Sequence, residues 1–228
     1  MANGRAVTRL MRSPRWRGLV LTIAALAVAA TFPGLNHGPA RIHTWSRIDA
    51  SIPLIPMFVL PYLSLFAFVA VSAGYLFVRH PRTFATAAGA VLLTLIASGA
   101  IYAVAQSYIA PPHFVHHGVA GSVLRLVYAA DGRYNAFPSL HVGLATVLAI
   151  QWWRSHDRLR WPMVAWAGLI VVSTVLIKQH FVADVIAGLV VAIAASVLSA
   201  RLSGDRGAGD PGPTPIRRRQ EVVTTGSP

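Results

Sequence analysis

Residues 178–188 read KQHFVADVIAG and separate two long apolar segments of the chain. The stretch contains the only lysine of the protein, Lys178, and places Asp184 four residues after His180. A charged side chain inside a membrane span costs on the order of 2.5–3.5 kcal/mol at the centre and less near the end. A carboxylate kept in such a segment therefore indicates a functional site, with His180 as its partner.

The composition around this stretch is typical of a membrane protein. Of the 228 residues, 55% are hydrophobic and only 12% are charged, and the mean hydropathy is +0.57. The charged fraction is about half that of a typical soluble domain. Because about 20 helical residues cross the hydrocarbon core, we expect an all-α fold, a six-span transmembrane helical bundle. The expected spans cover residues 17–34, 55–78, 84–106, 138–153, 161–178 and 182–200.

A single membrane domain, residues 16–202, is expected between two polar ends. Residues 1–15 are basic, and residues 203–228 are rich in Gly, Pro, Arg and Thr. Segments of this composition bury too little apolar surface to fold, so both ends are expected to be disordered. The chain has no cysteine, which excludes disulfide bonds and thiolate metal sites.

The basic residues indicate how the domain is oriented. If the N-terminus is cytoplasmic, the cytoplasmic segments carry 15 of the 20 Lys and Arg residues. Such a bias predicts a multi-pass protein of the cell membrane with both termini in the cytoplasm. The net charge of +13 then follows from topology and from attraction to anionic lipid headgroups, so no nucleic-acid partner is expected.

The same topology puts several polar residues at one end of the bundle. His141, at the start of the fourth span, and His180 and Asp184, at the start of the sixth, lie on the outer side. The loop before the fourth span lies there too and carries Arg125 and Arg133. Two histidines, a carboxylate and several cations at one depth form a candidate site on the extracytoplasmic face.

The stretch FPSLH, residues 137–141, adds a feature that suits phosphate. Pro138 fits the first turn of a helix because its missing N–H has no partner there. Free N–H groups at a helix N-terminus bind phosphate, and the hydroxyl of Ser139 is a further donor. Lys178 and the two loop arginines would stabilise charge on the phosphoryl oxygens.

These residues carry a family resemblance. PSLH at 138–141 and STVLIKQHFVAD at 173–184 resemble two signature motifs of the type 2 phosphatidic acid phosphatase superfamily, usually written P-S-G-H and S-R-x5-H-x3-D. Leu140 replaces the glycine, Thr174 replaces the arginine, and a K-x6-R-P motif is missing ahead of the third and fourth spans. The resemblance extends over most of the chain from the second span onward.

The departures point to one branch of that superfamily. A leucine in PSLH and proline-rich segments, here residues 52–62 and 110–112, resemble the inositol phosphorylceramide synthase branch. The resemblance implies a lipid phosphate or phospholipid substrate. It leaves the acceptor as either water or an alcohol such as inositol. Transfer to an alcohol would make the protein a phosphotransferase, and with an inositol lipid as the donor the transferred group would be an inositol-phosphate-type head group.

The resemblance also implies roles for the catalytic residues. His180 would attack phosphorus and form a phosphohistidine, with Asp184 orienting its imidazole. His141 would protonate the leaving oxygen and then take a proton from the acceptor. Neither a metal nor another cofactor is implied. Charge and position, rather than the resemblance, make Lys178 the replacement for the missing cationic phosphate ligand.

Two other classes of protein stay open. A transporter or proton-relay protein could use the intramembrane His180–Asp184 pair, although it would more often place polar residues at mid-depth in several spans. A haem or metal protein could use His141 and His180 as ligands. Three loop histidines would add to such a set: His113, His116 and His117.

Overall fold

The structure, a computed structural model, describes residues 13–110, 112 and 118–204. In these ranges the regular structure is helical, and the remaining backbone pairing consists of two isolated β-bridges, Ile42–Ser107 and Tyr108–Tyr134. The expected all-α fold is confirmed for this part of the chain. The helices are α2 (Pro14–Ala29), η1 (Phe32–Leu35), α3 (Arg47–Ser51), η2 (Pro56–Phe58), α4 (Val59–Leu63), α5 (Leu65–Arg79), α6 (Pro81–Val104), α7 (Gly118–Ala130), α8 (Leu140–Arg154), α9 (Arg160–Leu176) and α10 (Val182–Ser203).

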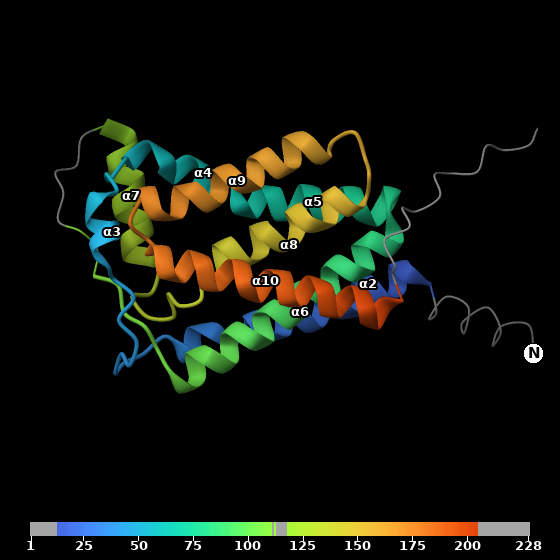
Figure 1. Cartoon of the computed structure of the whole chain (residues 1–228), viewed down its shortest axis with the longest axis horizontal. Helices are drawn as coiled ribbons and strands as arrows, with labels where there is room; N and C mark the ends of the chain where they lie inside the picture. Colours follow the sequence, from blue (N-terminus) through green and yellow to red (C-terminus); the bar gives the residue numbers. More distant parts are fainter. Residues whose placement is uncertain (1–12, 111, 113–117, 205–228) are drawn as a thin grey trace, which may run out of the picture.

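The longer helices form a bundle around α8. Helices α2, α5, α6, α8, α9 and α10 lie side by side, and each runs opposite to the one before it in this series (Figure 1). Helix α8 packs against α6, α9 and α10, and its Trp152 is fully buried. The guanidinium of Arg17 donates to Ser203 Oγ at 2.9 Å. The start of α2 therefore lies beside the end of α10, while α7 crosses the opposite end of the bundle (Figure 1).

Among the described residues, four segments are long and apolar enough to cross a membrane: Pro14–Leu35, Pro56–Arg79, Pro81–Val104 and Val182–Ser203. Helices α8 and α9 have only 15 and 17 residues. At 1.5 Å per residue they extend about 22 and 25 Å, which is less than the roughly 30 Å of the hydrocarbon core. The structure thus supports four of the six expected spans by length and composition, and it has shorter helices at the other two.

The second expected span is interrupted only at Ser64, where the Ser64 N–H still donates to the Leu60 carbonyl at 3.0 Å. Pro61 has no N–H to donate within a helix. The chain instead forms η2 and the short α4 before α5 begins, and the Ser64 hydroxyl donates to the Pro61 carbonyl at 2.6 Å. Tyr62, on α4, lies at the end of the bundle that α7 crosses, and α4 contacts α7.

The starts of α8 and α10 are joined directly. Helix α8 begins at Leu140, two residues after Pro138, and Ser139 is its N-cap, accepting the Val142 N–H at 3.3 Å. The Ser139 N–H donates to the carbonyl of Asp184 at 3.1 Å. Two segments that are far apart in the sequence are thereby held together where His141 and Asp184 lie.

The expected disordered ends fall almost entirely outside the described residues. Of residues 1–15 only 13–15 are described, and of residues 203–228 only 203–204. Ser13 caps α2, which begins at Pro14, so the helix starts slightly before the expected domain boundary.

Candidate active site

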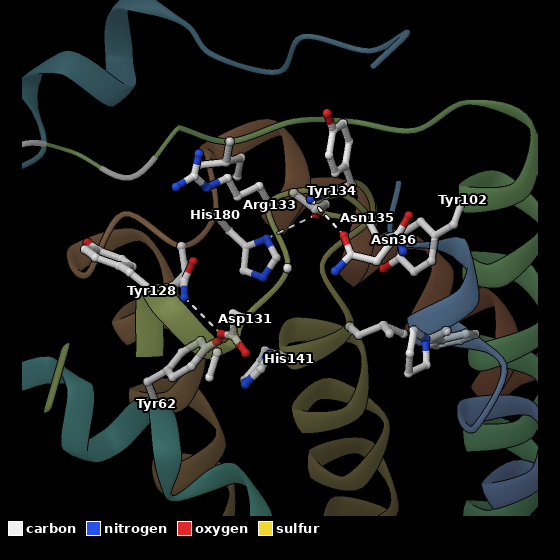
Figure 2. Close-up of a pocket in the computed structure, with 18 of the residues that line it drawn as sticks. Asn36, Tyr62, Tyr102, Tyr128, Asp131, Arg133, Tyr134, Asn135, His141 and His180 are labelled. Carbon is white, nitrogen blue, oxygen red and sulfur yellow. Dashed lines mark hydrogen bonds between the residues drawn. The ribbon is translucent and has the colours of Figure 1, made fainter. Parts of the chain in front are cut away.

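His141 and His180 line one cavity at the α7 end of the bundle (Figure 2). His141 lies in the first turn of α8, and His180 lies in the turn between α9 and α10. Their ring centroids are 6.3 Å apart and the ring planes differ by 49°. The cavity has a volume of about 600 Å³. Both imidazoles belong to the lining of this cavity, and Nε2 of His141 is buried without a hydrogen-bond partner among the described residues.

A backbone carbonyl orients the His180 ring. Nδ1 of His180 lies 3.1 Å from the carbonyl oxygen of Ala136 (Figure 2). Because a carbonyl oxygen only accepts, Nδ1 carries the proton when this bond is formed. The lone pair of a neutral imidazole is then on Nε2, which is the nitrogen available to a ligand.

Asp184 contributes negative charge next to His180. The carboxylate is fully buried, and its Oδ2 accepts the Phe181 N–H at 2.8 Å. The same oxygen lies 3.8 Å from Nδ1 of His180, which is too long for a hydrogen bond. The other oxygen, Oδ1, is buried without a hydrogen-bond partner among the described residues. The positive end of the α10 dipole further favours a carboxylate in this first turn.

Tyr62 covers one face of His141. The two rings stack with centroids 4.0 Å apart and planes 12° apart. The Tyr62 hydroxyl donates to Asp131 Oδ2 at 2.7 Å, and Nε2 of Gln179 donates to the same oxygen at 2.9 Å (Figure 2). Asp131 directly follows α7. Its carboxylate connects Tyr62, which stacks on His141, to Gln179, which precedes His180.

The predicted phosphate-binding residues lie in different places. Arg133 lines the histidine cavity. Arg125 is exposed on α7, and Ser139 is buried at the start of α8. Lys178 lines a second cavity of about 520 Å³ instead. Of these four residues, the structure places only Arg133 at the cavity of the two histidines.

Lys178 fastens the segment before α4 to the turn between α9 and α10. Its Nζ donates to the carbonyl oxygens of Asp49 at 2.6 Å and Ile52 at 2.5 Å. Asp49 Oδ1 accepts the Val182 N–H at 2.8 Å. Burial of Asp49 opposes its ionisation, but hydrogen bonds from Ser46 and Val182 and the Lys178 charge leave the Asp49 pKa below its ordinary value. The contacts of Lys178 and Asp49 therefore hold residues 49–52 against the turn between α9 and α10.

The cavity has a polar end and an apolar wall. The polar end, in the loops, contains Asn36, Asp131, Arg133, Asn135 and Gln179. The apolar wall, from the helices of the bundle, contains Ala29, Phe32, Phe66 and Leu140. Because Phe66 is 70% exposed, this wall continues onto the outer surface of the bundle.

A comparison with protein-family models supplies the family. The model of the PAP2 superfamily matches residues 44–198. This chain belongs to the PAP2 superfamily. Membership supports a phosphatase or phosphotransferase type of activity on phosphate-containing substrates. Searches among curated proteins and solved structures found no match.

The matched PAP2 region contains site residues that sequence reasoning missed. Ala136 contacts His180 through its backbone carbonyl, and a backbone contact of this kind leaves no pattern of residue types in the sequence. Tyr62 and Asp131 come from separate elements, so no spacing relates them to His141. One signal was available for Asp131, which is one of only four acidic residues between positions 16 and 202.

Within residues 13–110, 112 and 118–204 there is no group of three or more His, Asp or Glu side chains placed to hold a metal ion. The loop histidines considered above as extra ligands, His113, His116 and His117, lie outside the described residues.

Proposed function

We propose that this protein is a membrane lipid phosphatase or phosphotransferase that works through a phosphohistidine on His180. The observation that carries the proposal is the cavity itself. It holds His141 and His180 with their rings 6.3 Å apart, and it joins a polar end to an apolar wall. A phosphorylated lipid has the same two parts.

The chemistry starts with Nε2 of His180, whose lone pair attacks phosphorus. A P–N bond forms and the P–O bond to the lipid alcohol breaks, while His141 gives a proton to the departing oxygen. Water or an alcohol then attacks phosphorus, His141 takes its proton, and the P–N bond breaks. The Ala136 carbonyl and the Asp184 charge stabilise the imidazole ring of His180 while it is positively charged.

Arg133 is the proposed cationic ligand of the phosphoryl oxygens, because it lines the same cavity as the histidines. Lys178, Arg125 and Ser139 remain predictions for this role. The described contacts of Lys178 and Ser139 are to backbone groups of the protein.

The proposed topology has six passes and an extracytoplasmic site. The alternating directions of the bundle helices support six passes, as does the contact between the start of α2 and the end of α10 (Figure 1). The short α8 and α9 lie against α5, α6 and α10, so neighbouring helices cover part of their length. The charge bias of the loops supports cytoplasmic termini.

The proposed finer specificity is transfer of an inositol-phosphate-type head group. It is supported by Leu140 within PSLH and by the proline-rich segments, which resemble the inositol phosphorylceramide synthase branch. Water as the acceptor would make the protein a phosphatase that uses the same two histidines.

The test measures phosphate release from a panel of lipid phosphates, with and without inositol or an inositol lipid, by the wild type and His180→Ala. His80→Ala is the matched control, since His80 also lies beside an aspartate, Asp157 at 3.0 Å, but at the other end of the bundle. We expect activity to vanish in His180→Ala and to persist in His80→Ala. A phosphoinositol product formed only when inositol or an inositol lipid is present identifies a transferase. Equal rates for the wild type and His180→Ala would overturn the mechanism and favour a proton-relay transporter.

A further inference from the structure

We propose that Tyr62 and Asp131 are positioning residues for His141, which hold its imidazole where it can protonate the leaving oxygen. The inference rests on the proposed function, because it assigns His141 the acid step. It concerns two residues outside the signature motifs, on elements that are distant from α8 in the sequence.

The contact between Tyr62 and His141 is close and nearly parallel. The centroids are 4.0 Å apart, the planes differ by 12°, and only 3% of Tyr62 is exposed. A ring packed this way blocks one face of the imidazole and limits rotation about its Cβ–Cγ bond. His180 lies on another side, with a centroid distance of 6.3 Å and a tilted plane. The orientation of His141 is therefore restrained by Tyr62.

The hydroxyl of Tyr62 fixes the position of the tyrosine ring itself. It donates to Asp131 Oδ2 at 2.7 Å. A hydrogen bond to a charged acceptor is stronger than one between neutral groups, so Tyr62 is held in place by its partner. The Asp131 carboxylate thus fixes the ring that stacks on His141, and the imidazole that is to donate to the leaving group keeps one orientation.

Asp131 also connects the surroundings of the two histidines. The same carboxylate oxygen accepts from Nε2 of Gln179 at 2.9 Å, and Gln179 directly precedes His180. One side chain at the end of α7 therefore joins α4, behind His141, to the turn that carries His180. Loss of this oxygen would loosen the spacing between the two imidazoles.

The chemistry of the leaving group separates a positioning role from ordinary packing. An alkoxide leaves poorly and needs a proton, whereas a nitrophenolate leaves without one. If Tyr62 positions His141, a Tyr62 variant loses activity chiefly on alkyl esters. If Tyr62 only stabilises the fold, the variant loses activity on both kinds of ester by the same factor.

The experiment uses purified full-length protein with dodecyl phosphate and a dodecyl-substituted nitrophenyl phosphate. For Tyr62→Leu we expect hydrolysis of dodecyl phosphate to fall on the order of 100-fold, as for other small misplacements of a catalytic group. Hydrolysis of the nitrophenyl ester should fall by only a few-fold. Tyr62→Phe and Asp131→Asn should also lose more activity on dodecyl phosphate than on the nitrophenyl ester, but by a smaller ratio. His141→Ala should show the largest ratio of the two losses.

Tyr75→Leu is the matched control. Tyr75 also donates its hydroxyl to an aspartate, Asp157 at 2.8 Å, and packs near a histidine, but at the opposite end of the bundle. It should leave the ratio of the two rates at the wild-type value. Tyr62→Phe and Asp131→Asn preserve side-chain volume, so they carry the test if Tyr62→Leu does not fold.

Equal losses on the two esters in the Tyr62 and Asp131 variants would overturn the inference. If His141→Ala showed the selective loss and these variants did not, the proposed function would stand and only the positioning role would fall. If the wild type cleaved neither ester, in water or with inositol present as the acceptor, the proposed function would fail, and the positioning role with it.

Discussion

The backbone carbonyl of Ala136 lies closer to Nδ1 of His180 than the carboxylate of Asp184 does, at 3.1 Å against 3.8 Å. Ala136 belongs to the loop that leads into α8 and His141. The loop therefore orients one histidine and is continuous with the helix that carries the other. A shift of this loop would move the Ala136 carbonyl and the start of α8 together. The carbonyl that orients His180 therefore keeps its position relative to His141.

Replacement of Asp184 by Asn is expected to reduce turnover on the order of 10–100-fold. In hydrolytic triads the corresponding change costs about 10⁴-fold because the histidine adopts the wrong tautomer. Here the Ala136 carbonyl retains the tautomer, so only the charge is lost. Steady-state rates per folded enzyme test this. A loss near 10⁴-fold would show that the carboxylate sets the tautomer, and no loss would show that its charge is not used.

Replacement of Lys178 by Met is expected to lower thermal stability by several degrees and to leave KM unchanged. The variant loses two hydrogen bonds from a charged donor, each contributing about 1.5–3 kcal/mol. Unfolding in detergent and lipid-phosphate kinetics measure the two effects. Arg133→Met is the counterpart and should raise KM instead. A large rise in KM for Lys178→Met would restore its predicted role as a phosphate ligand.

The stabilising effect of Asp49 is expected to depend on pH. Its pKa is lowered in the folded protein from an ordinary value of 3.8. A lowered pKa means that the stabilisation is fully present above the ordinary value and is lost as the pH falls through the lowered one. The difference in unfolding free energy between the wild type and Asp49→Asn, about 2 kcal/mol near neutrality, should shrink below pH ~4. A difference that stays constant on acidification would contradict this.

The helices could be predicted from the sequence, because long apolar runs locate the bundle helices to within a few residues. The motif spacings select His141, His180 and Asp184 as candidates, and their catalytic roles stay predictions. Span number was less predictable, because α8 and α9 are shorter than a hydrocarbon core and are covered by neighbouring helices. Lys178 lies only two residues before His180, yet its backbone has a positive φ of 56° and its side chain reaches other carbonyls. Proximity in sequence does not determine side-chain direction in a turn.

The proposed orientation can be tested by single cysteines, because the chain contains none. Ala129→Cys places a thiol on the exposed end of α7, and Leu159→Cys places one at the opposite end of the bundle. A membrane-impermeant maleimide should label Ala129→Cys in intact cells and Leu159→Cys only after permeabilisation. The reverse pattern would put the site on the cytoplasmic face.

The most direct test of the phosphohistidine on His180 is to trap it. The enzyme would be mixed with a lipid substrate radiolabelled in its phosphate and quenched during turnover, with His80→Ala as the control. We predict label on the protein that survives alkali and is lost in acid, present in the wild type and His80→Ala and absent in His180→Ala. Turnover without such label, or equal label in His180→Ala, would contradict the assignment of His180 as the nucleophile.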